Sequence, residues 1–306
     1  MKMDDDGRGK DLNAMDTDTS KSSMMTLLWK IPTIAAVYFA GASFSGWISE
    51  GLGLRFPEFP GREYSPVLGY LAALVLAAGV SLLARGLRGS TAWRWLMLFA
   101  FTYTAYCVNN QIEGAVFTTE SGFESNLVFF LLPCALATVA AVLLFDAPDE
   151  DPVLTTVFSD RPVSSWWWRF GIAWVAFPFI YYFFGAFAYP LVKDAYQSGD
   201  FALEVPSQSL ILGAAFTRSL LFLLATIPIL MYWSKSRRSL VFSLGAALAA
   251  MVGLVAMIEA IWLPTPVRIV HGVEIAIDSL VHAWVLVALL IPRSFERLNV
   301  ETSGSS

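Results

Sequence analysis

Four ionisable side chains in the C-terminal third of the chain are spaced so that they share one face of a helix. His271, Glu274, Asp278 and His282 follow one another at intervals of three, four and four residues, and the chain has no other histidine. This spacing places all four on one stripe, which covers roughly 16 Å at a rise of about 1.5 Å per residue. Imidazoles and carboxylates exchange protons and bind cations, so the stripe indicates a proton relay or a cation site.

Further ionisable side chains lie within or beside other apolar segments. Arg218 lies about a dozen residues inside its segment, and we expect it to pair with Asp278 because a guanidinium in lipid needs a carboxylate or carbonyls around it. We expect Arg268 to neutralise one of the carboxylates predicted at the same end, namely Glu113, Glu259 or Glu274. The complete set of predicted binding or proton-relay residues is Glu113, Glu124, Arg218, Glu259, Arg268, His271, Glu274, Asp278 and His282.

These residues also have a purely structural interpretation. Ion pairs between membrane helices fix packing, and a lone buried pair such as Arg218 with Asp278 often only sets the register of two helices. The four-residue stripe exceeds what packing requires, because each buried ionisable group costs several kcal/mol unless it is paired or hydrated. The stripe therefore favours function more strongly than the pair does.

The sequence does not favour a metal centre or an enzyme. His271 and Glu274 have the spacing of helix-borne ligands in carboxylate-bridged metal centres, but no other apolar segment contains a histidine. Glu113, Glu124 and Glu259 would have to complete a site of hard ligands. Zinc-protease, nucleophile-elbow and phosphate-cradling glycine motifs are missing from the sequence. We therefore predict no metal and no cofactor.

The segments that carry these residues are long and apolar. Hydrophobic residues make up 56% of the 306 residues and charged residues only 15%, which is unlike a soluble domain. A net charge of -5, with its basic residues scattered, argues against a nucleic-acid partner. A bilayer core of about 30 Å needs roughly 20 apolar residues in a helix. We therefore predict an all-α membrane protein with eight transmembrane helices, near residues 31–48, 65–84, 95–112, 125–145, 170–192, 205–233, 240–263 and 273–292.

Basic residues gather on one side of these predicted spans. Short loops rich in lysine and arginine stay in the cytoplasm. Of the 20 basic residues, Arg218 lies inside a span, and only Arg55, Arg62, Lys193 and Arg268 lie in the loops of the opposite side. The distribution predicts that both termini are cytoplasmic and that the protein lies in the inner (cytoplasmic) membrane.

The two halves of the sequence contain matching motifs. The run 38–42 matches the run 182–186 at an offset of 144, and Ile112-Glu113 matches Ile258-Glu259 at an offset of 146. Four spans per unit would give both halves the same orientation, so we predict two parallel four-helix repeats. The predicted divisions are a disordered cytoplasmic tail (1–25), a first repeat (26–146), a cytoplasmic linker (147–165), a second repeat (166–293) and a cytoplasmic C-terminal tail (294–306).

Three motifs of the second half carry a resemblance to a known family. They are the run Tyr-Phe-Phe-Gly at 182–185, Arg218 followed by Pro228, and the run 267–274, which contains Arg-x-x-His-x-x-Glu. In residues 175–292 the chain resembles a family of uncharacterised bacterial multi-pass integral membrane proteins. The resemblance implies a membrane-embedded helical fold and brings no activity with it.

The leading functional hypothesis is a transporter with an outward-facing polar cleft between the repeats. Its partners would be the lipid bilayer and a small solute, a cation or protons. One alternative is an intramembrane enzyme that acts on a lipid or isoprenoid substrate. Another is a non-catalytic membrane sensor or assembly protein, in which the polar residues only hold the fold together. A hydrated cavity between the repeats would favour transport, and a dry seam would favour a structural role.

Overall fold

The described part of the chain is almost entirely helical. The computed structural model describes residues 8–56, 65–118, 122–147, 161–199 and 201–292. Within these ranges two isolated β-bridges are the only strand-like pairing. The helical elements include two π-helical segments, η1 and η2. In chain order they are α1 (Arg8–Gly51), α2 (Pro66–Ala84), α3 (Thr91–Thr102), η1 (Tyr103–Val108), α4 (Asn109–Phe117), α5 (Phe123–Leu144), α7 (Val163–Gln197), α8 (Gln208–Met231), α9 (Arg237–Leu248), η2 (Ala249–Leu254), α10 (Val255–Glu259) and α11 (Thr265–Leu290).

Seven helical stretches among the described residues are long and apolar enough to cross a membrane. They are α1 from Leu27 onward, α2, α5, α7, α8, α11 and the continuous run of α9, η2 and α10. Large apolar side chains on these helices face outward. Phe179, Phe183 and Phe187, one turn apart on α7, are 73%, 60% and 67% exposed. Such a surface suits lipid rather than water, so the chain is a multi-pass membrane protein, as its composition predicted.

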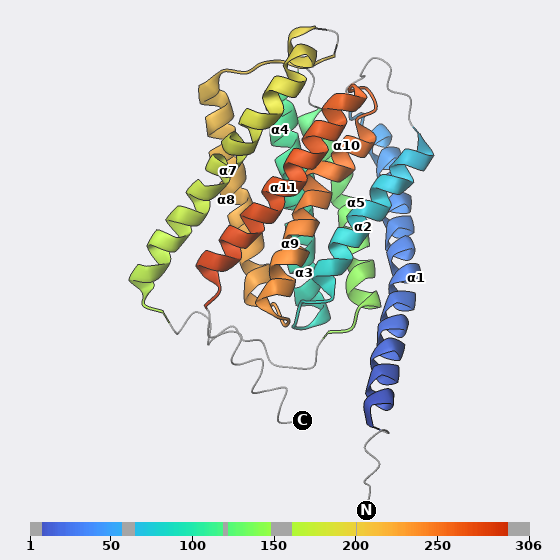
Figure 1. Cartoon of the computed structure of the whole chain (residues 1–306). Coiled ribbons are helices and arrows are strands. Elements are labelled where there is room, and N and C mark those ends of the chain that lie inside the picture. Colours follow the sequence, from blue (N-terminus) through green and yellow to red (C-terminus); the bar gives the residue numbers. More distant parts are fainter. Residues whose placement is uncertain (1–7, 57–64, 119–121, 148–160, 200, 293–306) are drawn as a thin grey trace, which may run out of the picture.

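The predicted span near 95–112 is helical but is not one of the seven. α3, η1 and α4 follow one another without a break from Thr91 to Phe117. Figure 1 shows α3 at one end of the bundle and α4 at the other. The stretch contains Asn109, Asn110, Gln111 and Glu113 close together, and these polar residues lower its mean hydropathy.

The two π-helical segments occupy corresponding places in the two halves. η1 begins at Tyr103 and η2 begins at Ala249, 146 residues later. The same offset separates Glu113 from Glu259, and the two segments contact each other. π-helical turns are rare and are frequent at functional sites. An uncommon backbone feature therefore recurs at the spacing of the matching sequence motifs.

α1 is longer than predicted. It begins at Arg8, within the segment 1–25 that was expected to be a disordered tail. The chain has no glycine or proline between Gly9 and Pro32, so nothing in this part stops the helix from continuing beyond its apolar portion. The first seven residues and the predicted tail at 294–306 lie outside the described residues.

α7 and α11 also extend beyond their predicted boundaries. α7 begins at Val163, inside the predicted linker 147–165, and its 35 residues cover about 50 Å, more than the bilayer core requires. Most of the linker, 148–160, lies outside the described residues. α11 begins at Thr265, before the predicted start at 273. Arg268 and His271 therefore belong to the helix itself.

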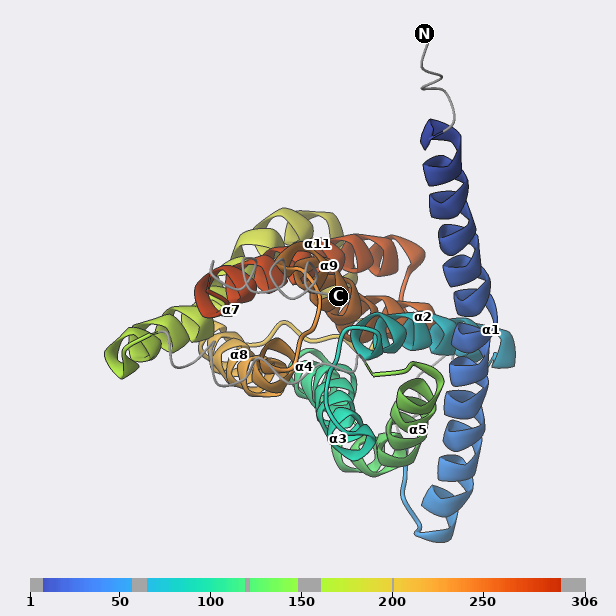
Figure 2. The same ribbon diagram turned by 90° about the horizontal axis from the view of Figure 1, so that it is seen from below.

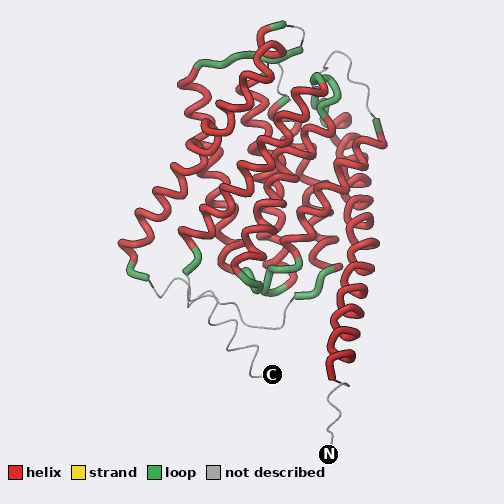
Figure 3. Tube along the Cα trace, in the orientation of Figure 1, coloured by secondary structure: helices red, strands yellow, loops and turns green. Residues whose placement is uncertain are grey.

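The bundle has two distinct ends. The first turn of α1 and the last turn of α11 lie at the same end, drawn at the bottom of Figure 1, and we call this the lower end. The connections gather at the lower end and at the opposite, upper end (Figure 3). Seen from below, α1 lies at one edge of the bundle and α7 at the other (Figure 2).

The helices of the two halves pack in the same order. α1 contacts α2 and α5, and α7 contacts α8 and α11. Between the halves, α2 packs against α9, η2 and α10, while α8 packs against α3, η1 and α4. The second helix of each half therefore contacts the third helical stretch of the other half, on both sides of the η1–η2 contact.

Close approach between helices depends on small residues. Within the first half, a Cβ atom on Gly41 would lie 3.0 Å from the Cα atom of Pro133. Between the halves, a Cβ atom on Gly79 would lie 3.3 Å from the Cα atom of Ala247. Helices in lipid associate through packing rather than through the hydrophobic effect, so small residues set the distance between them.

Two loops at the lower end, one from each half, pair with each other. Leu87 and Trp233 form an antiparallel β-bridge. The backbone N–H and the hydroxyl of Ser234 both donate to the carbonyl of Gly86 at 2.8 Å. The Nη2 atom of Arg88 donates to the carbonyl of Ser234 at 3.0 Å, across 146 residues of chain. These bonds connect the two halves at the lower edge of the apolar core, to which Leu87 and Trp233 both belong.

Replacing Gly86 by alanine is expected to weaken this connection. The new methyl group would overlap the ring of Trp233, which is 1% exposed and has no room to move. We expect a loss of about 1–3 kcal/mol, seen as a lower Tm of the purified protein in detergent. Gly171→Ala is the control on α7, where a Cβ atom meets nothing within 4 Å, and should leave Tm unchanged or raise it slightly because alanine favours a helix more than glycine does. Equal Tm values for the two variants would contradict the loop packing.

Candidate functional site

The upper part of the α11 stripe is a chain of hydrogen bonds. His271 Nδ1 lies 2.8 Å from Glu274 Oε2, and His271 Nε2 lies 3.3 Å from the hydroxyl of Tyr196 at the upper end of α7. α7 also packs beside Glu274 at Gly185, where a Cβ atom would lie 3.5 Å from Glu274 Oε1, an ordinary van der Waals contact. The side chain of His271 is 23% exposed and that of Glu274 is 10% exposed. The chain of bonds therefore begins at the surface and leads inward.

The lower part of the stripe is buried. Asp278 and His282 are 6% and 2% exposed. The imidazole of His282 packs against the rings of Phe177 and Phe222, with centroids 5.2 and 5.9 Å away. Its Nε2 atom has no hydrogen-bond partner in the described part of the chain. Burial thus increases along the stripe from the upper end toward the middle of the bundle.

Asp278 and His282 border a small cavity between the two halves. Its volume is about 20 Å³, which is room for about one water molecule. Glu113 and Arg218 line the same cavity. We call Glu113, Arg218, Asp278 and His282 the seam cluster.

An ion pair crosses the seam. Arg218 Nη2 on α8 lies 2.8 Å from Glu113 Oε2 on α4. The rings of Phe177 and Tyr181 flank the guanidinium, with centroids at 5.6 and 5.7 Å. Asp278 was the expected partner of Arg218, but α4 packs directly against α8 and brings Glu113 to the guanidinium. The pair therefore links the first half of the chain to the second.

Arg268, which was expected to neutralise a carboxylate, binds helix carbonyls. Its Nε atom donates to the carbonyl of Met257 at 2.6 Å, and its Nη2 atom donates to that of Ile258 at 3.0 Å. These carbonyls belong to the last turn of α10, where carbonyl oxygens have no helical partner and carry partial negative charge. Arg268 thus stabilises the end of a helix.

Glu259 and Glu124 lie apart from the seam cluster. Glu259 accepts a hydrogen bond from the hydroxyl of Tyr106 at 3.4 Å, and that hydroxyl accepts one from Tyr38 at 3.0 Å. Glu124 is exposed in the first turn of α5, where a carboxylate complements the positive end of the helix dipole. The structure therefore gathers six of the predicted residues around the stripe and the seam and gives the other three separate surroundings.

Two asparagines extend the polar character of the seam to the π-helical segments. Asn110 Nδ2 donates to the carbonyl of Met251 in η2 at 3.0 Å, and this bond also crosses between the halves. Asn109 Nδ2 donates to the carbonyl of Thr104 in η1 at 3.0 Å. A π-helical turn displaces carbonyls from the regular helical ladder and so makes them available to side chains. The seam is thus held by polar bonds as well as by packing.

The geometry suits proton exchange better than metal binding. No group of three or more histidine, cysteine, aspartate or glutamate side chains in the described ranges is arranged to hold a metal ion. Instead a hydroxyl, an imidazole, two carboxylates and a second imidazole follow one another from the surface to the seam cavity. Groups of this kind pass protons over short distances.

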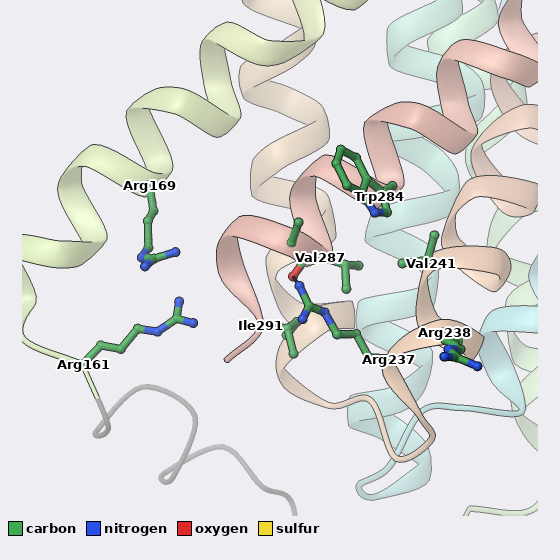
Figure 4. Close-up of a pocket in the computed structure, with 9 residues that line it drawn as sticks. Arg161, Arg169, Arg237, Arg238, Val241, Trp284, Val287 and Ile291 are labelled. Atoms are coloured by element: carbon green, nitrogen blue, oxygen red, sulfur yellow. Dashed lines mark hydrogen bonds between the residues drawn. The ribbon is translucent and has the colours of Figure 1, made fainter. Parts of the chain in front are cut away.

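A larger cavity lies at the lower end, among basic residues whose distribution predicted only the orientation of the chain. It has a volume of about 760 Å³ and is bordered by α7, α9 and α11 (Figure 4). Spacing within single segments could not reveal it, because the residues come from separate helices. The nearest signal was that basic residues lie close to the start of two predicted spans. The arginines that line the cavity are Arg161, Arg169, Arg237 and Arg238.

No protein-family model matches the chain, and no curated protein or solved structure matches it either. The resemblance of residues 175–292 to bacterial multi-pass membrane proteins therefore stays a prediction. Function has to be inferred from the geometry of the two cavities and of the stripe.

Glu113→Gln is expected to destabilise the protein strongly. It would leave the charge of Arg218, whose side chain is only 4% exposed, without its ion-pair partner. Losing one partner of a buried pair costs about 3–5 kcal/mol. Glu124→Gln removes the same charge from an exposed helix start and should cost about 1 kcal/mol or less. Thermal unfolding in detergent measures both, and similar Tm values for the two variants would contradict the seam pair.

Proposed function

We propose that the protein is a proton-coupled transporter and that the stripe on α11 is the outer part of its proton path. The observation that carries the proposal is the order of the stripe. Partly exposed His271 and Glu274 lead to buried Asp278 and His282, which border a cavity at the seam between the halves. Ionisable groups inside a membrane are expensive, so four in sequence indicate a pathway.

The size and charge of the seam cavity favour protons over a solute or a metal cation. A volume of about 20 Å³ admits about one water molecule and no organic solute, so this cavity is not the hydrated cleft expected between the repeats and only the proton path of the transport hypothesis is retained. A dehydrated Mg²⁺ or Ca²⁺ ion needs six or more oxygen ligands, and the guanidinium of Arg218 in the cavity wall would repel it. The same small volume gives little support to the alternative of an enzyme acting on a lipid or isoprenoid. A proton requires neither the volume of a solute nor the oxygen ligands of a metal cation.

We propose further that the chain crosses the membrane eight times. The first turn of α1 and the last turn of α11 lie at the same end of the bundle, which requires an even number of crossings. The seven apolar stretches become eight when the helical run 91–117 is added. The positive-inside rule then places both termini in the cytoplasm and the upper end outside an inner membrane.

A duplication of four helices accounts for the correspondence between the halves. The π-helical segments and the matching motifs support it at offsets of 144 or 146 residues, and each half also contributes one of the two paired lower loops. Two parallel repeats related by an axis along the membrane normal would have the proton path at their interface. In that arrangement the Glu113–Arg218 pair closes the seam on the outer side, and rocking of the halves would break it.

Asp278→Asn is expected to abolish proton-driven activity. The asparagine amide has nearly the same shape as the carboxyl group but does not take up or release a proton at the pH values of the experiment. In proteoliposomes with a trapped pH indicator, proton uptake should slow by about 100-fold or more. The infrared carboxyl band of Asp278 should respond when the external pH is stepped from about 5 to about 9 and should be missing in the variant.

Asp194→Asn is the matched control, because Asp194 is exposed near the upper end of α7. This variant should retain both the proton uptake and the pH-dependent carboxyl band. A carboxyl band that ignores external pH, or uptake that is unchanged by Asp278→Asn, would contradict the proposed proton path.

A further inference from the structure

The lower cavity differs from the seam cavity in size, charge and position. Its volume of about 760 Å³ lies within the range of about 300–1,000 Å³ typical of ligand pockets. Figure 4 shows Arg161 and Arg169 reaching into it from the α7 side, with Arg237 opposite. Trp284 and Val287 of α11 form its apolar wall. The cavity therefore combines cationic and apolar walls at a membrane-facing surface.

The end of α11 holds three of the arginines in place. Arg161 Nη1 and Arg169 Nη1 both donate to the carbonyl of Leu289, at 3.1 and 2.7 Å. Arg237 Nη2 donates to the carbonyl of Val287 at 3.3 Å. Carbonyls at a helix C-terminus attract cations, so part of the arrangement is helix capping. A guanidinium has five N–H groups, and these few bonds leave Arg169 and Arg237 further donors for an anion.

Capping does not account for Arg238. Its side chain is exposed, lines the same cavity and has no hydrogen-bond partner among the described residues. The described residues that line the cavity include four arginines and no aspartate or glutamate. Four like charges around one space repel one another unless an anion enters it. Guanidinium groups bind phosphate through two parallel hydrogen bonds, which suits the planar donors of arginine.

The apolar surface next to the cavity indicates where such an anion would come from. Ile269, Val273, Ile277, Leu280 and Trp284 form one exposed stripe along α11, with Trp284 60% exposed. The last of them belongs to the cavity wall. Acyl chains of a membrane lipid would lie along this stripe while the headgroup occupies the cavity. Basic pockets between helices on the cytoplasmic side of membranes bind anionic headgroups in this manner.

We infer that the lower cavity is a binding site for the phosphate headgroup of an anionic membrane lipid. The inference is independent of the proton path, because it rests on other residues at the opposite end of α11. A lipid bound there joins α7 to α9 and α11 through one headgroup. It thereby stabilises the lower end of the second half, where α7 and α11 are connected through the Arg161 and Arg169 bonds to Leu289.

Native mass spectrometry of the full-length protein in detergent tests the inference directly. Titration with phosphatidic acid should show one saturable lipid that binds at least about tenfold more tightly than phosphatidylcholine with the same acyl chains. Arg238→Gln should lower the affinity for phosphatidic acid about fivefold, and Arg238→Lys should retain most of this affinity. Arg238 caps no helix, so its loss should leave Tm without lipid unchanged.

Arg85→Gln is the matched control, since Arg85 follows α2 at the lower end but does not line the cavity. It should leave phosphatidic acid binding unchanged, and an equal loss in this variant would show general attraction to a basic surface and overturn the site. Equal affinity for the two lipids would also overturn it. Displacement of phosphatidic acid by inorganic phosphate at similar concentration would show that the cavity binds a soluble anion. It would overturn the inference that the ligand is a lipid.

Discussion

The structure depends on the fact that hydrocarbon is a poor solvent for charge. Arg218 lies deep in α8, and its guanidinium is neutralised by a carboxylate from the other half of the chain, Glu113 on α4. Because a single buried charge costs far more than a paired one, this bond holds α4 against α8. The hydrogen bond from Asn110 to η2 also crosses the seam and also holds the two halves together. The polar seam and the position of the two halves are therefore consequences of one electrostatic requirement.

α11 has different chemistry at its two ends. Near its N-terminus it carries imidazoles and carboxylates in a descending stripe, while the carbonyls at its C-terminus attract arginines from α7 and α9. Between the two lies apolar helix surface, including fully buried Leu286. One helix thus carries an upper region suited to proton exchange and a lower region suited to binding an anion. This separation is what a protein needs if it is to treat the two faces of a membrane differently.

The features that could be predicted from the sequence are those that depend on one helix at a time. Hydropathy located the apolar stretches, and helical periodicity placed His271 and Glu274 within hydrogen-bonding distance. Prediction from the sequence failed for contacts that depend on which helices lie side by side. The partner of Arg218 and the arginine cavity follow from contacts of α8 with α4 and of α7 with α11, which spacing along the chain does not encode. The helix-capping role of Arg268 was missed because Arg268 was placed in a loop, whereas α11 begins at Thr265 and holds Arg268 beside the last turn of α10.

Exchanging the charges of Glu113 and Arg218 tests most directly whether their ion pair holds the two halves together. The variants Glu113→Arg and Arg218→Glu each place like charges at the seam, and the double variant restores an ion pair with its direction reversed. The account predicts that both single variants lower Tm sharply and that the double variant recovers much of the loss, so the effects are far from additive. A double variant as unstable as the sum of the single ones would show that the two residues do not form the pair on which the seam depends.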